Sequence, residues 1–155
     1  TPEQRQTAYT DMARIALEHL EFGAVRSRGQ ALLRIYNADL KEHGYESGFT
    51  FVEMVNDDMP FLVDSVAAAI NRHNLAVHIT VHPIIRVLRN SRGKVEKILE
   101  RNDEKGRLES FIRFAVDKVV QGVRRAVRGV VPDVELGGLV AVEAGGAGHR
   151  ARVPQ

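Results

Sequence analysis

The sequence contains no cysteine, and its 155 residues include no long apolar run. Without cysteine the chain has neither disulfides nor thiolate metal ligands, which agrees with a reducing compartment. A membrane-spanning helix needs about 20 consecutive apolar residues, and the N-terminal residues lack the basic-then-apolar order of a secretory signal. We therefore expect a cytoplasmic protein without membrane contact.

Aromatic residues are few, at 6%, and the formal net charge is only +2. A nucleic-acid-binding surface combines a basic stripe with interleaved aromatic residues, and no segment has this pattern. The hydrophobic fraction of 44% and the charged fraction of 27% are typical of a globular domain with a real core. The composition therefore favours one globular domain that does not bind nucleic acid.

Residues 50–82 have the pattern of a strand, an acidic turn, an amphipathic helix and a second strand. In the turn, Asp57 or Asp58 is suited to cap the helix, and Pro60 fits its first turn. Asn74 suits the left-handed residue that ends a helix. One helical face is marked by residues at three- and four-residue spacing: Leu62, Val66, Ala69, Ile70 and His73.

A second amphipathic helix is predicted at the N-terminus, because Thr1, Pro2 and Gln4 have the makings of a capping box and Gly23 is placed to end the helix. Its apolar stripe consists of Tyr9, Met12, Ala13, Ala16 and Leu20.

Strands are predicted at 31–37, 50–56, 75–89, 94–101 and 110–117, with a hairpin turn at 90–93. Strand 50–56 is apolar on both faces except at Glu53, which indicates an inner strand. Pro83 predicts a bulge, an edge position or a bend in strand 75–89. That strand alternates between an apolar face (Leu75, Val77, Ile79, Val81, Ile85 and Val87) and a polar face (His78, Thr80 and His82).

From residue 119 onward the composition shifts to Val, Gly, Arg and Ala. We expect a helix and linker at 1–30, a folded domain at 31–118, and an atypical tail at 119–155. The tail is compatible with a short helix followed by weak order, and a truncated or frame-shifted end would explain the change in composition.

Three motifs that could take part in catalysis or binding have simpler explanations. The segment 146–151 fits the dinucleotide pattern G-x-G-x-x-A, but no helix or second strand can follow it. His78 and His82 would stand about 13 Å apart on a strand, too far to share a metal ion. Asp57, Asp58 and the later Asp64 could hold a cation or act as acid and base, but helix capping and dipole stabilisation already explain acids at this position and are the favoured interpretation. The sequence shows no catalytic set.

Residues 30–118 closely resemble the N-terminal region of the large bacterial NAD-specific glutamate dehydrogenases, most specifically in VNDDMPFLVDSV and in the VHP of residues 81–83. The resemblance implies an α+β fold, an ACT-like (ferredoxin-like βαββαβ) antiparallel sheet with helices on one face, preceded by the N-terminal helix. It also implies NAD as the cofactor of the parent enzyme, with none in this segment.

In ACT domains a D-x-P-G-L-type turn approaches a small amino-acid ligand. The matching residues are Asp58, Met59, Pro60, Phe61 and Leu62, and with Asp57 they form the candidate ligand site; Phe61 stands where a glycine would permit close approach. The alternative is that the turn only enters the helix and Phe61 fills core or interface. No catalytic or metal residues are predicted.

Three functions follow as hypotheses. The first is a non-catalytic regulatory and assembly module of an NAD-dependent glutamate dehydrogenase. The second is an amino-acid-binding allosteric sensor. The third is a contributor of residues, with His78 and His82 as candidates, to a neighbouring active site. The implied partners are the rest of the dehydrogenase, a small amino-acid effector and further copies of the chain in a homo-oligomer.

Overall fold

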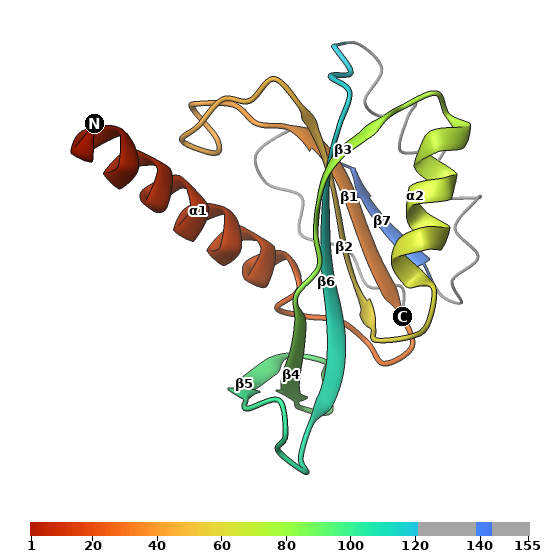
Figure 1. Ribbon diagram of the computed structural model, residues 1–155. Helices are drawn as coiled ribbons and strands as arrows, with labels where there is room; N and C mark the ends of the chain where they lie inside the picture. The colour runs from red at the N-terminus through yellow and green to blue at the C-terminus, as the bar shows by residue number, and fades with distance from the viewer. Residues whose placement is uncertain (121–138, 144–155) are drawn as a thin grey trace.

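The computed structural model describes residues 1–120 and, as backbone, 139–143. The described segments form a seven-stranded sheet in the order β5-β4-β6-β2-β1-β7, with β3 also paired to β6, and two helices (Figure 1). The elements are α1 (Pro2–Phe22), β1 (Ala31–Asn37), β2 (Thr50–Asp57), α2 (Leu62–Arg72), β3 (Val77–Val81), β4 (Ile84–Arg89), β5 (Val95–Leu99), β6 (Arg107–Val116) and β7 (Leu139–Glu143).

Strand β6 organises the sheet, because β2 pairs with one of its edges while β3 and β4 share the other. The break between β3 and β4 falls at Pro83, whose carbonyl oxygen accepts the Phe111 N–H at 3.0 Å. The interruption predicted at Pro83 is therefore confirmed. Strand β2 lies between β1 and β6 and is buried along nearly its whole length, as an inner strand should be.

Helix α2 covers one face of the sheet. Its predicted apolar face is confirmed, since Leu62, Val66, Ala69 and Ile70 are buried, and Asn74 has the predicted left-handed φ of 59°. The antiparallel sheet and this helix confirm the predicted α+β fold with an ACT-like arrangement. The core beneath α2 also contains Leu33, Ile35, Val52, Met54, Ile112, Phe114 and Val116.

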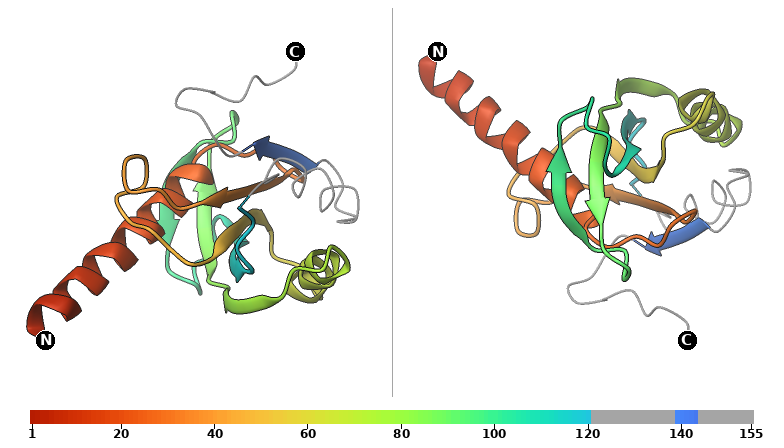
Figure 2. Two further views of the ribbon diagram at one scale, coloured as in Figure 1. Left: turned by 90° about the horizontal axis from the view of Figure 1, so that it is seen from above. Right: turned by 90° about the horizontal axis from the view of Figure 1, so that it is seen from below.

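Helix α1 lies on the opposite face, and its N-terminal half extends away from the sheet (Figures 1 and 2). The capping box at Thr1 and the end at Gly23 are confirmed. The predicted apolar stripe, however, is not the face that packs: Tyr9 is 64% exposed and Met12 65%. The residues that pack on the sheet are Ile15, His19, Leu20 and Phe22, so only Leu20 belongs to both sets.

The predicted apolar face of residues 75–89 is divided between the two sides of the sheet. A register shift between Val77 and Ile79 reverses the alternation, because one extra residue turns every later side chain over. Val77 packs toward the α2 core, whereas Ile79 and Val81 lie on the opposite face, 50% and 49% exposed. The prediction that all six apolar residues share one buried face is wrong for this reason.

Two predicted features of the tail fall mainly outside the described residues: the short helix after residue 119 and the segment 146–151. Residues 139–143 form β7, which pairs in parallel with β1 and was not predicted as a strand.

Candidate functional site

The acidic turn after β2 does not cap α2 as predicted. The helix begins at Leu62, its N-cap residue is Phe61, and no side chain caps it. Asp57 Oδ1 instead accepts a hydrogen bond from Arg26 Nη2 at 2.6 Å, and Asp58 Oδ1 accepts one from Ser110 Oγ at 2.9 Å. Both carboxylates have partners on other segments, and both precede the helix by too many residues to reach its free N–H groups.

The six predicted ligand-site residues point in different directions. Asp57 lies on the α1 side of the sheet, Leu62 is buried under α2, and Met59 and Phe61 are 45% and 78% exposed. Phe61 therefore does not fill the core of this domain. Its φ of 61° is the left-handed conformation that glycine adopts without a Cβ clash. The turn thus has the backbone conformation of a glycine position. Phe61, however, carries a side chain where a glycine would leave space for a ligand.

A buried row of charges crosses the α1 face of the sheet. Arg34, Glu53 and Arg113 are cross-strand neighbours on β1, β2 and β6. Glu53 Oε1 accepts from Arg113 Nη1 at 2.6 Å, and Glu53 Oε2 accepts from Arg34 Nε at 2.6 Å. Glu53 is fully buried, so this carboxylate is held by two guanidinium groups in the interior.

Tyrosines complete the row. Tyr36 Oη donates to Glu53 Oε1 at 2.9 Å, and Arg113 Nη2 donates to Tyr45 Oη at 3.1 Å. Burial, together with the Glu53 carboxylate, raises the pKa of Tyr36 above its usual value. Because these groups satisfy one another, the row stabilises the fold and leaves no open reactive centre.

His19 packs beside this row on the α1 face. It is 7% exposed, and its Nε2 donates to the Met54 carbonyl oxygen at 3.2 Å. Burial lowers the pKa of His19. A neutral imidazole therefore links α1 to the central strand.

The two histidines of the polar strand face are engaged within the domain. His78 Nε2 lies 2.6 Å from Asp117 Oδ1, and the Ala76 N–H and His78 together lower the pKa of Asp117. His82 Nε2 lies 2.9 Å from Ser110 Oγ, which in turn donates to Asp58. Since the single hydroxyl proton of Ser110 is directed to Asp58, His82 does not act as its base in this arrangement.

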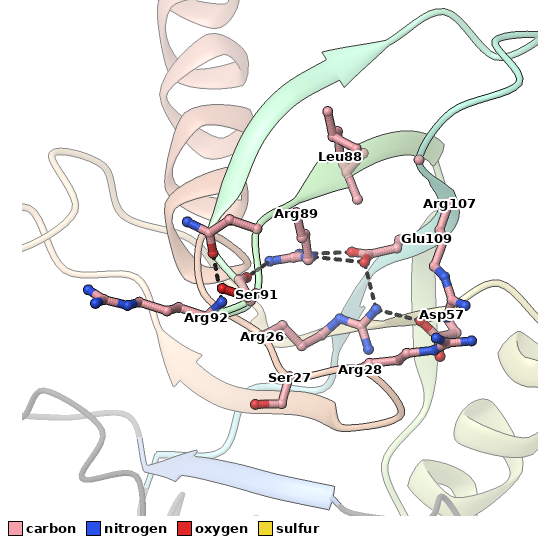
Figure 3. A pocket seen from close by; sticks show the side chains of 14 residues that line it. Arg26, Ser27, Arg28, Asp57, Leu88, Arg89, Ser91, Arg92, Arg107 and Glu109 are labelled. Carbon is pink, nitrogen blue, oxygen red and sulfur yellow. Dashed lines mark hydrogen bonds and ion pairs between the residues drawn. The ribbon is translucent and has the colours of Figure 1, made fainter.

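A cleft of about 610 Å³ opens at the end of the sheet where the β4–β5 hairpin meets the segment between α1 and β1 (Figure 3). Val87 and Leu88 of β4 form the apolar part of the cleft wall. Its charged lining residues come from four parts of the chain: Arg26, Arg28, Asp57, Arg89, Arg92, Arg107 and Glu109.

The floor of the cleft is a closed ion-pair network. Glu109 Oε1 accepts from Arg26 Nη2 at 2.6 Å, and Glu109 Oε2 accepts from Arg89 Nη2 at 2.8 Å. Arg89 also donates to the carbonyl oxygens of Gly23 at 2.7 Å and Gly93 at 2.8 Å. The network thereby joins the end of α1, the hairpin and β6.

The sequence predicts Asp57 as a candidate ligand-site residue but predicts no role for these arginines. The arginines are spread over residues 26–107, so no local motif contains them. Only the pairing of β4 with β6 and the return of the α1–β1 segment bring them together.

In the described residues, no group of three or more His, Cys, Asp or Glu side chains is arranged to hold a metal ion. No helix in the same part of the chain is long and apolar enough to cross a membrane.

Comparison of the sequence with known proteins identifies the family of this chain. Residues 2–128 match the family described as "Glutamate dehydrogenase, ACT1 domain". The NAD-specific glutamate dehydrogenase of Pseudomonas aeruginosa is 32% identical over 110 residues, which cover 69% of this chain and 7% of that protein. The enzyme of the same name from Halomonas elongata is 35% identical over 88 residues, covering 56% of this chain and 6% of that protein.

The chain thus spans less than a tenth of the length of these relatives. The family match covers helix α1 as well as residues 30–118, the segment whose sequence resembles these dehydrogenases. This chain belongs to the family of glutamate dehydrogenase ACT1 domains.

Proposed function

We propose that this domain is a non-catalytic assembly and regulatory module of an NAD-dependent glutamate dehydrogenase, the enzyme that converts L-glutamate and NAD to 2-oxoglutarate and ammonia. The buried charged groups described above are paired with one another, and the histidines of the polar strand face form hydrogen bonds within the domain. These features support a structural role for these buried charged groups and for the two histidines.

The observation that carries the proposal is the exposed apolar stripe of α1. A helix turns by about 100° per residue, so residues 9, 13 and 17 lie on the side opposite the packed residues 15, 19 and 22, and residue 12 lies at the border between the two sides. Tyr9, Met12 and the neighbouring Leu17 are each more than 60% exposed. An apolar stripe on a helix is normally buried against another element.

The occupant of this stripe is the remainder of the dehydrogenase polypeptide. The two relatives contain more than nine tenths of their length outside the matched region. The stripe lies on a helix that extends beyond the sheet, and is therefore accessible to a neighbouring domain (Figure 1). Burying Tyr9, Met12 and Leu17 there would contribute about 1.5–3 kcal/mol for each fully covered side chain.

The test places Met12→Glu in the full-length dehydrogenase that carries this domain. We expect loss of the native assembly in light scattering, or a change in the regulation of its activity, because a charge would enter an apolar contact. Thr7→Glu is the matched control, since Thr7 is also exposed on α1 but lies off the stripe. Unchanged assembly and regulation in the Met12→Glu variant would contradict the assembly role. In a separate assay, NADH production by the isolated chain with L-glutamate and NAD would contradict the non-catalytic role.

A second candidate, an amino-acid sensor, is favoured by one observation. The N-terminus of α2 has no side-chain cap, and its N–H groups suit the carboxylate of a ligand. Thermal unfolding of the isolated chain with a panel of amino acids tests this role. A ligand at 100 times its Kd would stabilise the chain by about 2.7 kcal/mol, and the absence of a shift with every amino acid would remove the candidate.

A further inference from the structure

We infer that the cleft between the α1–β1 segment and the β4–β5 hairpin binds a small multivalent anion, whose carboxylate or phosphate groups are contacted by Arg28 and Arg107, with Arg92 adding to the positive charge at the other side of the cleft (Figure 3). This cleft is separate from the exposed stripe of α1 and from the uncapped start of α2. The inference therefore does not depend on either proposed role.

The cleft carries an excess of positive charge. Five arginines and two carboxylates line it, which leaves a formal charge of +3. The two carboxylates, Asp57 and Glu109, are already paired with Arg26 and Arg89 in the floor of the cleft. The excess charge consequently belongs to the other three arginines.

Arg28, Arg92 and Arg107 have no side-chain partner in the part of the chain that the structure describes. Arg28 comes from the α1–β1 segment, Arg92 from the hairpin turn and Arg107 from the start of β6. Figure 3 shows the Arg28 and Arg107 side chains pointing toward the Asp57 end of the cleft, whereas Arg92 points away from them. Two like charges that face the same end of a cleft repel each other, and an anion between them relieves this repulsion.

The wall of the cleft contains an unsatisfied hydrogen-bond donor. The Arg26 side chain is only 1% exposed, and its Nε is a buried side-chain atom without a hydrogen-bond partner among the described residues. Buried polar atoms are nearly always paired, so this one leaves an uncompensated positive donor inside the wall, which adds to the preference of the cleft for an anion without contacting it. The surface arginines alone would not supply this feature.

The cleft walls are held in place before any ligand arrives. The Arg26 N–H donates to the Gly93 carbonyl oxygen at 3.0 Å, and the Val95 N–H donates to the Ala24 carbonyl oxygen at 2.9 Å. The hairpin and the α1–β1 segment are therefore joined by backbone hydrogen bonds. A wall joined in this way fixes the backbone positions from which the arginines extend, which lowers the entropic cost of binding.

The charge pattern selects the class of ligand. A guanidinium group matches carboxylate and phosphate oxygens in the same forked geometry. A free monocarboxylic amino acid fits poorly, because its ammonium group would face arginines while both carboxylates of the cleft are occupied. The volume of about 610 Å³ lies within the range of small-molecule sites. A dicarboxylate or a di- or triphosphate satisfies all of these conditions.

The test is calorimetric titration of the isolated chain with glutarate, pyrophosphate and ATP, with acetate as the monoanion. We expect binding of at least one multivalent anion and at least tenfold weaker binding of acetate. Each of Arg28→Gln and Arg107→Gln should weaken that binding at least fivefold, and the double variant more. Both side chains are exposed and outside the ion-pair network, so circular dichroism should show unchanged folding.

Arg5→Gln is the matched control, because it removes the same charge from the exposed start of α1. It should leave the affinity within a factor of two. Binding of glutarate alone identifies carboxylates as the ligand groups, and binding of the phosphates alone identifies phosphates. The absence of binding by every multivalent anion, or an equal loss of affinity in Arg5→Gln, would overturn the site.

Discussion

Replacement of Glu53 by leucine is expected to lower the free energy of unfolding by about 3–5 kcal/mol, because removing one partner of a buried ion pair leaves uncompensated charge in the interior. Glu53 is fully buried, and Arg113, which it neutralises, is 7% exposed. The substitution also removes the acceptor of the Tyr36 hydroxyl. Urea denaturation of the isolated chain, followed by circular dichroism, measures the change.

The double variant Glu53→Leu, Arg113→Leu is the control for this prediction. It removes both opposite charges and should recover part of the lost stability, since replacing a whole buried ion pair by apolar residues is often nearly neutral. Arg34 is 23% exposed in its side chain and can be solvated when Glu53 is absent. A Glu53→Leu variant within about 1 kcal/mol of the natural protein would show that the row contributes little.

Replacement of Gly93 by alanine is expected to destabilise the domain by about 2–5 kcal/mol, which combines a left-handed backbone cost of about 1–2 kcal/mol with a steric overlap of about 1–3 kcal/mol. Its φ is +79°, and an added Cβ would lie 2.4 Å from the Arg26 carbonyl oxygen. The overlap is with backbone, so it must move the hairpin away from the α1–β1 segment. Urea denaturation again gives the change in stability.

Gly29→Ala separates the two contributions. Gly29 has a similar φ of +74°, but a Cβ there would meet nothing within 4 Å. Its cost should therefore be only the backbone cost of about 1–2 kcal/mol. Equal destabilisation by Gly29→Ala and Gly93→Ala would contradict the steric contact, and with it the close joining of the two cleft walls.

The local elements of this protein could be read from short-range patterns. The capping box at Thr1, the end of α1 at Gly23, the left-handed Asn74 and the buried face of α2 all depend on residues within a few positions of each other. The break at Pro83 follows from the missing N–H of one residue. Such features depend on chemistry that a single segment contains.

The candidate sites could not be read in this way, because their residues are distant in the sequence. Arg26 and Glu109 meet across 83 positions, and Glu53 and Arg113 across 60. Glu53 was recognisable as the one acid in an apolar strand, but its partners depended on which strands lie beside β2. Asp57 was assigned to a helix cap because Arg26 could not be placed next to it.

By itself, then, the sequence determined the α+β class, the order of the main elements and the family resemblance, because these depend on periodicity and on contiguous motifs. Only the tertiary structure decided which face of α1 packs, where the register shift in β3 turns Ile79 and Val81 to the other side of the sheet, and how the arginines converge on one cleft. The physical reason is that burial and ion pairing depend on strand register and on long-range packing, and no local spacing specifies either of them.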